Sequence, residues 1–216
     1  MKNYVIAIED NPKSMTYAHR CIASGYSVGG ININIFNAIT PRNTNVREML
    51  AENLIPETNF DEVYSRTDNC IAAFLSHFSL WKMCAAGHDT FTIFEHDAVC
   101  TNNINSMMSF EHVLNIGEPS YGKYNTPASF GVGPLVSKKY FPGAHAYMVT
   151  PKGAQMLIDR AMVDGGPTDT FLHIDRFPTL QEYYPWLAKA DDAFTTIQVE
   201  RGCLAKHNWG DGYEII

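Results

Sequence analysis

The sequence predicts an α/β fold, because short apolar runs alternate with segments of helical spacing along most of its 216 residues. Residues 4–8 (YVIAI) are a continuous apolar run, typical of a strand covered on both faces. A helix at about 13–24 and a strand at 31–36 follow, so the chain opens with a βαβ unit. Apolar residues make up 45% and charged residues 18%, which excludes a disordered chain and fits one globular domain spanning 1–216.

The remaining elements are predicted from caps and periodicity. Asp68 or Asn69 is expected to cap a mostly buried helix that ends at Gly87. Thr150 as N-cap and Pro151 at the first helical position predict a helix through about residue 162. Further elements are expected as strands at 91–94, 145–149 and 194–199, a short helix at 46–53 and a turn or short helix at 168–169. Residues 117–143, rich in Gly, Pro, Tyr and Ser, are interpreted as an active-site flap.

Composition narrows the cellular setting. No apolar stretch approaches the length that crosses a bilayer, and the opening MKNYVIAIED is too acidic for a signal peptide. We therefore expect a cytoplasmic protein, or one attached to a membrane surface through a partner. The net charge of −7 argues against a large nucleic-acid surface. Five cysteines without a CxxC pair indicate reduced, packed thiols and no zinc ribbon.

The strand at 91–94 ends abruptly in Glu95-His96-Asp97. Carboxylates at the carboxyl end of a buried strand lie at the crevice where open α/β sheets bind ligands. Residues two apart in an extended chain point the same way, so Glu95 and Asp97 would share one side. Such a pair suits Mn²⁺ or Mg²⁺, and a bound metal would neutralise a departing nucleotide diphosphate. The alternative is a solvated acidic turn.

Five blocks of sequence occur in a fixed order: FNAI at 36–39, SHFSLW at 76–81, EHDA at 95–98, GAHAYMVTPKGA at 143–154 and PTD at 167–169. Together they resemble glycosyltransferase family 25, which includes bacterial lipooligosaccharide and collagen galactosyltransferases. The chain departs from the family pattern before the Ser-His motif, where Ala72-Ala73 replaces Gly-Cys, and at two candidate site positions. His96 stands where the family has a second acid, and Asn37 stands where it has Asp.

The resemblance implies that Asp97 ligates a metal bridging the donor diphosphate, with Glu95 supporting it directly or through the ribose. Asn37 would help to hold the nucleoside. Arg20, after the first strand, is a candidate for the diphosphate, although its position favours the alternative of a surface arginine. His207 is a candidate third metal ligand from the carboxyl-terminal segment, the alternative being a solvated tail residue.

For the chemistry itself, the resemblance implies that Asp169 is the general base that deprotonates the acceptor hydroxyl. The alternative is a helix N-terminal carboxylate stabilised by the helix dipole. His77 lies on a helix that is apolar nearly all round, which is typical of a core histidine. Its motif favours a place near the donor-binding residues.

The resemblance thus implies a GT-A-type, Rossmann-like fold that transfers a hexose, with inversion, from a UDP-sugar to a hydroxyl. UDP-galactose and UDP-glucose are the expected donors, and a glycan such as lipooligosaccharide is the expected acceptor. Two alternatives stay open. In the first, the same enzyme chemistry acts on a hydroxylated base in DNA. In the second, suggested by His96, the chain is an inactive nucleotide-sugar or glycan-binding module.

Overall fold

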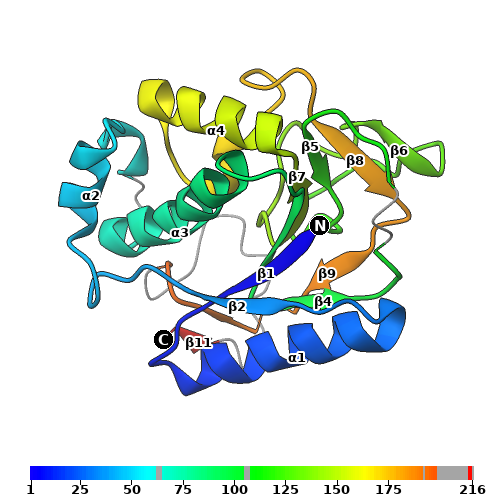
Figure 1. Ribbon diagram of the computed structural model, residues 1–216, viewed down its shortest axis with the longest axis horizontal. Coiled ribbons are helices and arrows are strands. Elements are labelled where there is room, and N and C mark those ends of the chain that lie inside the picture. Colours follow the sequence, from blue (N-terminus) through cyan, green and yellow to red (C-terminus); the bar gives the residue numbers. More distant parts are fainter. Residues whose placement is uncertain (62–64, 105–107, 192, 199–213, 216) are drawn as a thin grey trace.

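The computed structural model describes residues 1–61, 65–104, 108–191, 193–198 and 214–215 (Figure 1). Its centre is a seven-stranded sheet in the order β2-β1-β3-β7-β5-β8-β6. The strands are β1 Lys2–Ala7, β2 Asn34–Asn37, β3 Phe91–Glu95, β4 Ala98–Cys100, β5 Val113–Asn115, β6 Gly131–Pro134, β7 Ala146–Val149, β8 Gln181–Tyr184, β9 Ala188–Ala190, β10 Phe194–Thr195 and β11 Glu214–Ile215. The helices are α1 Pro12–Gly29, α2 Val46–Glu52, α3 Thr67–Ala85, α4 Pro151–Asp164 and α5 Thr168–Phe171, with a 3₁₀ turn η1 at Thr58–Phe60.

The predicted βαβ unit is confirmed. β1 pairs in parallel with β2 on one side and with β3 on the other. The sheet then becomes mixed, because β7 runs antiparallel to β3 and to β5. The register places Ile6 of β1 opposite Glu95, the last residue of β3. The carboxyl ends of β1, β2 and β3 therefore meet at one edge of the sheet, which is where the site is found.

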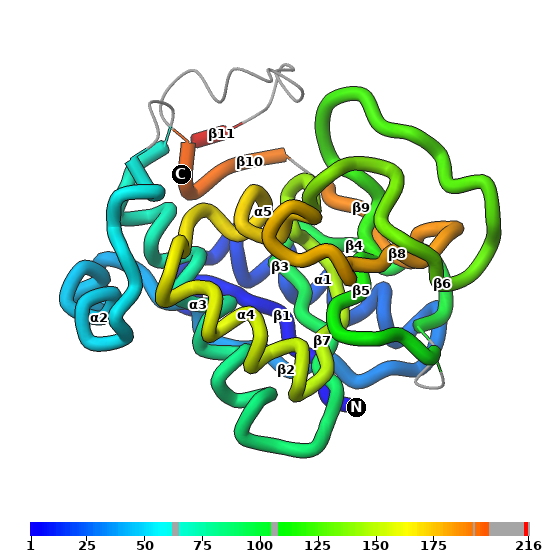
Figure 2. Tube along the Cα trace, turned by 90° about the horizontal axis from the view of Figure 1, so that it is seen from above, coloured from blue at the N-terminus to red at the C-terminus, as the bar shows by residue number. Residues whose placement is uncertain are grey.

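Helices cover both faces of the sheet. Figures 1 and 2 show α3 and α4 packed side by side on one face, while α1 lies on the other. The sheet separates two apolar clusters, the larger one under α3 and α4 and the smaller one under α1. In α3 nearly every side of the helix is buried, as its wide apolar stripe predicted.

The start of α3 differs from the prediction. The helix begins at Thr67 with Arg66 as its N-cap residue, and Asp68 and Asn69 lie inside the first turn. Contacts with a segment distant in the sequence explain this shift. The Arg66 amide donates to the Ile197 carbonyl (2.8 Å), and the Asn69 side chain donates to the Thr196 carbonyl (2.6 Å) instead of capping the helix.

α4 begins as predicted, since the Thr150 hydroxyl accepts from the Gly153 amide (3.0 Å) and Pro151 follows it. Gly153 also allows a close approach, because a Cβ there would lie 2.3 Å from the His112 carbonyl oxygen. This explains why the block GAHAYMVTPKGA needs a glycine at that position. Tertiary packing thus fixes a residue that helix propensity alone would disfavour.

Other boundaries shift. α1 continues to Gly29 and ends at Gly30, whose φ of 63° suits glycine, whereas the prediction ended the helix at residue 24. The second strand is β2 at Asn34–Asn37, later than predicted. The predicted flap at 117–143 contains strand β6, which pairs with β8. The predicted last strand is reduced to β10, and its end at residue 199 lies outside the described residues.

Four of the five cysteines lie in the described part of the chain, where all are buried: Cys21, Cys70, Cys84 and Cys100. This agrees with the expectation of packed thiols. Among the described residues, none of the helices has the length and apolarity that a membrane span requires.

Candidate functional site

A cavity of about 700 Å³ opens where β1, β2 and β3 end. This volume is within the range of small-molecule sites, about 300–1,000 Å³. Ile8, Ala38 and Glu95 line it from these three strand ends, and the opposite wall comes from α3, α5 and residues 194–198. Topology thus places the cavity at the crevice that α/β sheets commonly use for ligands.

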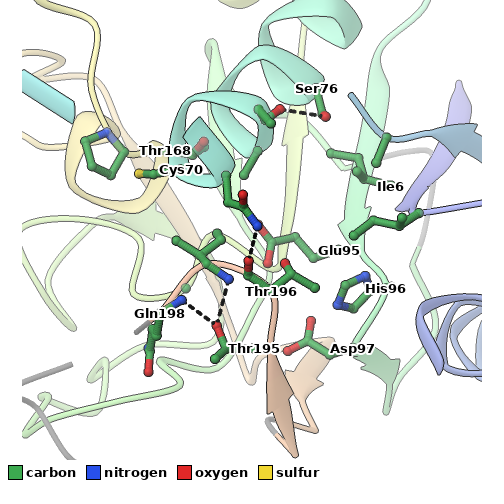
Figure 3. Close-up of a pocket in the computed structure, with 18 of the residues that line it drawn as sticks. Ile6, Cys70, Ser76, Glu95, His96, Asp97, Thr168, Thr195, Thr196 and Gln198 are labelled. Atoms are coloured by element: carbon green, nitrogen blue, oxygen red, sulfur yellow. Dashed lines mark hydrogen bonds between the residues drawn. The ribbon is translucent and has the colours of Figure 1, made fainter. Parts of the chain in front are cut away.

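Glu95, His96 and Asp97 all line the cavity and are half-buried, so they do not form a solvated turn. Figure 3 shows them next to one another, opposite Thr195 and Thr196. β3 ends at Glu95, and Asp97 lies in the turn that leads to β4. The two carboxylates therefore reach one cavity through a turn, and the alternation of an extended strand does not place them.

The Ser-His motif of α3 bonds to two parts of the cavity lining, the loop after β2 and the end of β3. The Ser76 hydroxyl donates to the Ala72 carbonyl (2.9 Å) and accepts from the Ile39 amide (2.9 Å), which pins the loop after β2 to the helix. His77 is 1% exposed, and its Nε2 lies 3.1 Å from Glu95 Oε1. One turn of helix thus positions both the loop after β2 and the end of β3.

The direction of each hydrogen bond around His77 follows from donor chemistry. The indole Nε1–H of Trp81 can only donate, and it points at the Tyr147 hydroxyl oxygen (2.8 Å). Tyr147 then donates its own proton to His77 Nδ1 (2.9 Å). His77 Nε2–H therefore donates to the Glu95 carboxylate. Burial lowers the pKa of His77 to about 3, with Asp169 acting in the opposite direction, so the ring is a neutral donor that holds Glu95 in place.

Replacing Tyr147 with Phe tests this chain. The variant leaves the Trp81 N–H and His77 Nδ1 buried without a partner, and each such group costs about 1–3 kcal/mol. We expect the free energy of unfolding in urea to fall by about 2–4 kcal/mol. Tyr183→Phe is the matched control, because within the described residues its hydroxyl makes no hydrogen bond; it should change stability by less than about 0.5 kcal/mol. Equal stabilities for both variants would contradict the assigned bonds.

His96 is held by Ser14 of α1. The Ser14 hydroxyl accepts from the Ile8 amide (2.8 Å) and lies 2.9 Å from His96 Nδ1. Within the described residues, this nitrogen is the acceptor available to the hydroxyl proton, so His96 carries its own proton on Nε2. The ring stacks on Phe194 (centroids 4.9 Å apart), and burial lowers the pKa of His96 to about 4. The residue that replaces an acid of the family pattern is therefore a fixed, neutral N–H donor.

Asp169 lines the same cavity from the start of α5. Its Oδ1 accepts from the Thr170 amide (2.8 Å), and its Oδ2 accepts a short hydrogen bond from the Tyr121 hydroxyl. Burial and the neighbouring Asp169 carboxylate raise the pKa of Tyr121, so the phenol keeps its proton. Asp169 thus lines the same cavity as Glu95 and Asp97, and two hydrogen bonds fix its orientation.

The other predicted donor-site residues lie further away. The Asn37 side chain donates to Glu9 Oε2 (2.7 Å), and Asn37 is not among the described residues that line the cavity. Arg20 forms an ion pair with Asp191 and reaches the backbone carbonyl of Asp97 (3.4 Å), so it supports the acidic turn from behind. His207 lies outside the described residues.

The residues present fit a hard divalent cation. Among the described residues, no cluster of three or more His, Cys, Asp or Glu is arranged to hold a metal, whereas Glu95 and Asp97 are two neighbouring carboxylates that line the cavity. Mg²⁺ in phosphate-transfer sites is commonly held by one or two carboxylates, with phosphate oxygens and water completing its shell. Two carboxylates beside a cavity large enough for a nucleotide match that ligand set.

Sequence reasoning did not identify several residues of the site. Tyr121 gave no signal beyond its place in a Tyr- and Gly-rich segment, and Ser14 gave none. His145 lies in the block GAHAYMVTPKGA and lines the cavity; burial lowers the pKa of its ring to about 4, although the Ala188 and Pro142 carbonyls act in the opposite direction. Arg66, the N-cap of α3, also lines the cavity and brings a positive charge to it.

Known proteins are similar to the chain in sequence and in structure. The model of glycosyltransferase family 25, described as an LPS biosynthesis protein, matches residues 1–126, more than half of the chain. Mouse xyloside xylosyltransferase 1 in its apo form is similar in structure, with 12% sequence identity, 83% of each chain covered and a TM-score of 0.43. The apo-form glycosyltransferase GlyE of Streptococcus pneumoniae TIGR4 has 11% identity, with 89% of this chain and 45% of that chain covered, and a TM-score of 0.40. No curated protein matches the sequence. The mixed sheet with helices on both faces confirms the α/β class predicted from the sequence.

Proposed function

Because the chain belongs to glycosyltransferase family 25, we propose that it transfers a hexose from a UDP-sugar to a glycan hydroxyl, with inversion at the anomeric carbon. One observation carries the proposal. Two carboxylates at the end of β3 and a third on α5, Asp169, face a single cavity at the carboxyl ends of parallel strands. We assign the two carboxylates after β3 to the donor and Asp169 to the acceptor.

On the donor side, Glu95 and Asp97 would hold Mn²⁺ or Mg²⁺, which when bound supplies positive charge to a leaving diphosphate. His77 keeps the Glu95 carboxylate turned into the cavity through its Nε2–H. His96 presents its Nε2–H as a neutral donor suited to a ligand oxygen. Arg66 adds a cation on the opposite wall, which favours an anionic donor.

On the acceptor side, Asp169 accepts the proton of the attacking hydroxyl. The acceptor oxygen forms a bond to the anomeric carbon while the bond from that carbon to the diphosphate oxygen breaks, and UDP leaves with the electron pair. Direct displacement from the face opposite the leaving group inverts the anomeric configuration. Tyr121 donates to Asp169 Oδ2 and so orients the carboxylate and covers it from water.

Binding of nucleotide sugars tests the donor class directly. A ligand at 100 times its Kd adds about 2.7 kcal/mol to the stability of the native state, which for a chain of this length raises Tm by roughly 5–10 °C. We expect UDP-galactose or UDP-glucose to give this shift only with Mn²⁺ or Mg²⁺, and GDP- and CMP-sugars to give none. A Tm shift with a UDP-sugar in the absence of metal would refute the proposed cofactor. The absence of a Tm shift with every UDP-sugar tested would refute the proposed donor.

The same preparation separates the proposed acceptor from its rivals. An enzyme hydrolyses the donor slowly in Mn²⁺ without acceptor, whereas an inactive binding module leaves it intact. Turnover stimulated by duplex DNA carrying hydroxylated bases, and lost steeply with added salt, would identify DNA as the acceptor in place of a glycan.

A further inference from the structure

Four aromatic rings form a connected row on the surface beside β6 and β8, the pair of strands at one edge of the sheet (Figure 1). Phe130 stacks on Tyr184 (centroids 5.8 Å apart, 11° between planes). Tyr184 meets Trp186 edge-on (5.1 Å, 82°), and Trp186 meets Tyr124 in the same way (5.5 Å, 88°). Phe130 is 80% exposed and Tyr124 39% exposed. Single exposed apolar residues need no explanation, but a connected row of rings does.

The row is held in place by buried polar contacts. Glu182 is 1% exposed, and its Oε1 accepts from the amides of Val136 (2.6 Å) and Ser137 (2.7 Å). Its Oε2 accepts from the indole N–H of Trp186 (3.3 Å). One buried carboxylate therefore fixes both the central ring and the chain just after β6. A surface fixed in advance loses little conformational entropy when a ligand binds.

Both segments that form the row continue into the cavity. Tyr121 lines the cavity and bonds to Asp169, and Tyr124 follows three residues later, so their Cα atoms are at most about 11 Å apart. Trp186 lies four residues before Ala190, another cavity-lining residue, which limits that separation to about 14 Å. Two rings of the row, Tyr124 and Trp186, therefore lie close in the chain to residues that line the cavity, and one of these residues, Tyr121, bonds to the proposed general base.

We propose that the aromatic row is the binding platform for the saccharide chain of the acceptor, a proposal that rests on the function given above. A pyranose ring presents C–H groups on its faces, which pack on aromatic rings, and hydroxyls around its edge, which need hydrogen-bonding partners. The row offers both. The Tyr124 hydroxyl donates to Glu118 Oε1 (2.9 Å), and this pair stands at one end of the stacked rings.

Other occupants fit less well. Stable protein interfaces bury about 800 Å² on each partner. Aromatic side chains bury about 150–250 Å² each when fully covered, and these four already cover one another in part, so the row falls short of that area. A nucleic acid is disfavoured by Glu118 beside Tyr124 and by the net charge of −7.

Phe130→Ala and Phe130→Leu test the platform, and Tyr26→Ala, which changes another exposed aromatic side chain, on α1, is the matched control. The probes are lactose and the core oligosaccharide released from lipooligosaccharide by mild acid. Direct binding is measured by saturation-transfer NMR without donor, and KM for the oligosaccharide is measured in the transfer reaction. We expect both Phe130 variants to weaken binding and raise this KM roughly 3- to 10-fold, because Leu cannot stack as a ring does. The Kd of UDP and the rate of donor hydrolysis should stay unchanged, and Tyr26→Ala should match the wild type.

Several results would overturn the platform. The first is unchanged oligosaccharide binding in both Phe130 variants. The second is the absence of saturation transfer to either probe in the wild type. The third is a wild type that sediments as a dimer and a Phe130→Ala variant that sediments as a monomer, because the row would then be a contact between two copies of the chain. A wild type that binds the oligosaccharide through Phe130 but never cleaves a nucleotide sugar would refute the proposed transfer reaction and leave the platform standing.

Discussion

Replacing Asp169 with Asn is expected to lower kcat for sugar transfer about 10²–10⁴-fold, the usual contribution of a positioned general base. The amide keeps the shape of the carboxylate: its single oxygen can still accept from the Thr170 amide, and its NH2 group can donate to the Tyr121 hydroxyl oxygen. It cannot take the proton of the acceptor hydroxyl. The Kd of the donor with Mn²⁺ should change by less than about twofold, because the variant leaves both carboxylates assigned to the donor, Glu95 and Asp97, in place.

Tyr121→Phe is the control for geometry. It removes only the hydroxyl that donates to Asp169 Oδ2, so Asp169 keeps its basic function but loses one of its two orienting bonds. A loss of about 10-fold or less in kcat is expected. If Asp169 serves only as a carboxylate at the start of α5, then Asp169→Asn will lower the unfolding free energy slightly and leave kcat intact. Steady-state transfer and urea unfolding on both variants distinguish these outcomes.

Replacing Asp97 with Asn is expected to abolish the metal-dependent response to UDP-sugars and to lower transfer by about 10²–10³-fold, or roughly 3–4 kcal/mol. A neutral amide oxygen cannot replace a carboxylate that balances the charge of a divalent cation. Titration of Mn²⁺ followed by electron paramagnetic resonance measures the loss directly, without turnover. Unfolding in urea shows whether the fold is intact.

Asp159→Asn, on the outer side of α4 and away from the cavity-lining residues, is the matched control and should bind Mn²⁺ and UDP as the wild type does. His77→Gln supplies a graded comparison. Its side-chain amide can still donate to Glu95, so metal affinity should fall less than in Asp97→Asn. Unchanged Mn²⁺ affinity in Asp97→Asn would remove this carboxylate from the proposed metal site.

The sequence by itself determined the βαβ opening, the start of α4 and the acidic end of β3. Each depends on neighbours in the chain: a run of apolar residues, a Thr-Pro cap, or carboxylates directly after a strand. The order of the five blocks also indicated the family. Such local patterns fix which elements form, because their hydrogen bonds and caps join residues within a few positions of one another.

Only the tertiary structure decided how the site is held. The bonds from His77 to Tyr147, from Ser14 to His96 and from Tyr121 to Asp169 join residues 70, 82 and 48 positions apart. The cap of α3 likewise moved to Arg66, because residues 196 and 197 bind its first turn. No periodicity encodes such contacts, since they arise only when the sheet order brings distant strand ends to one edge. A buried donor must then find its acceptor wherever packing has placed one.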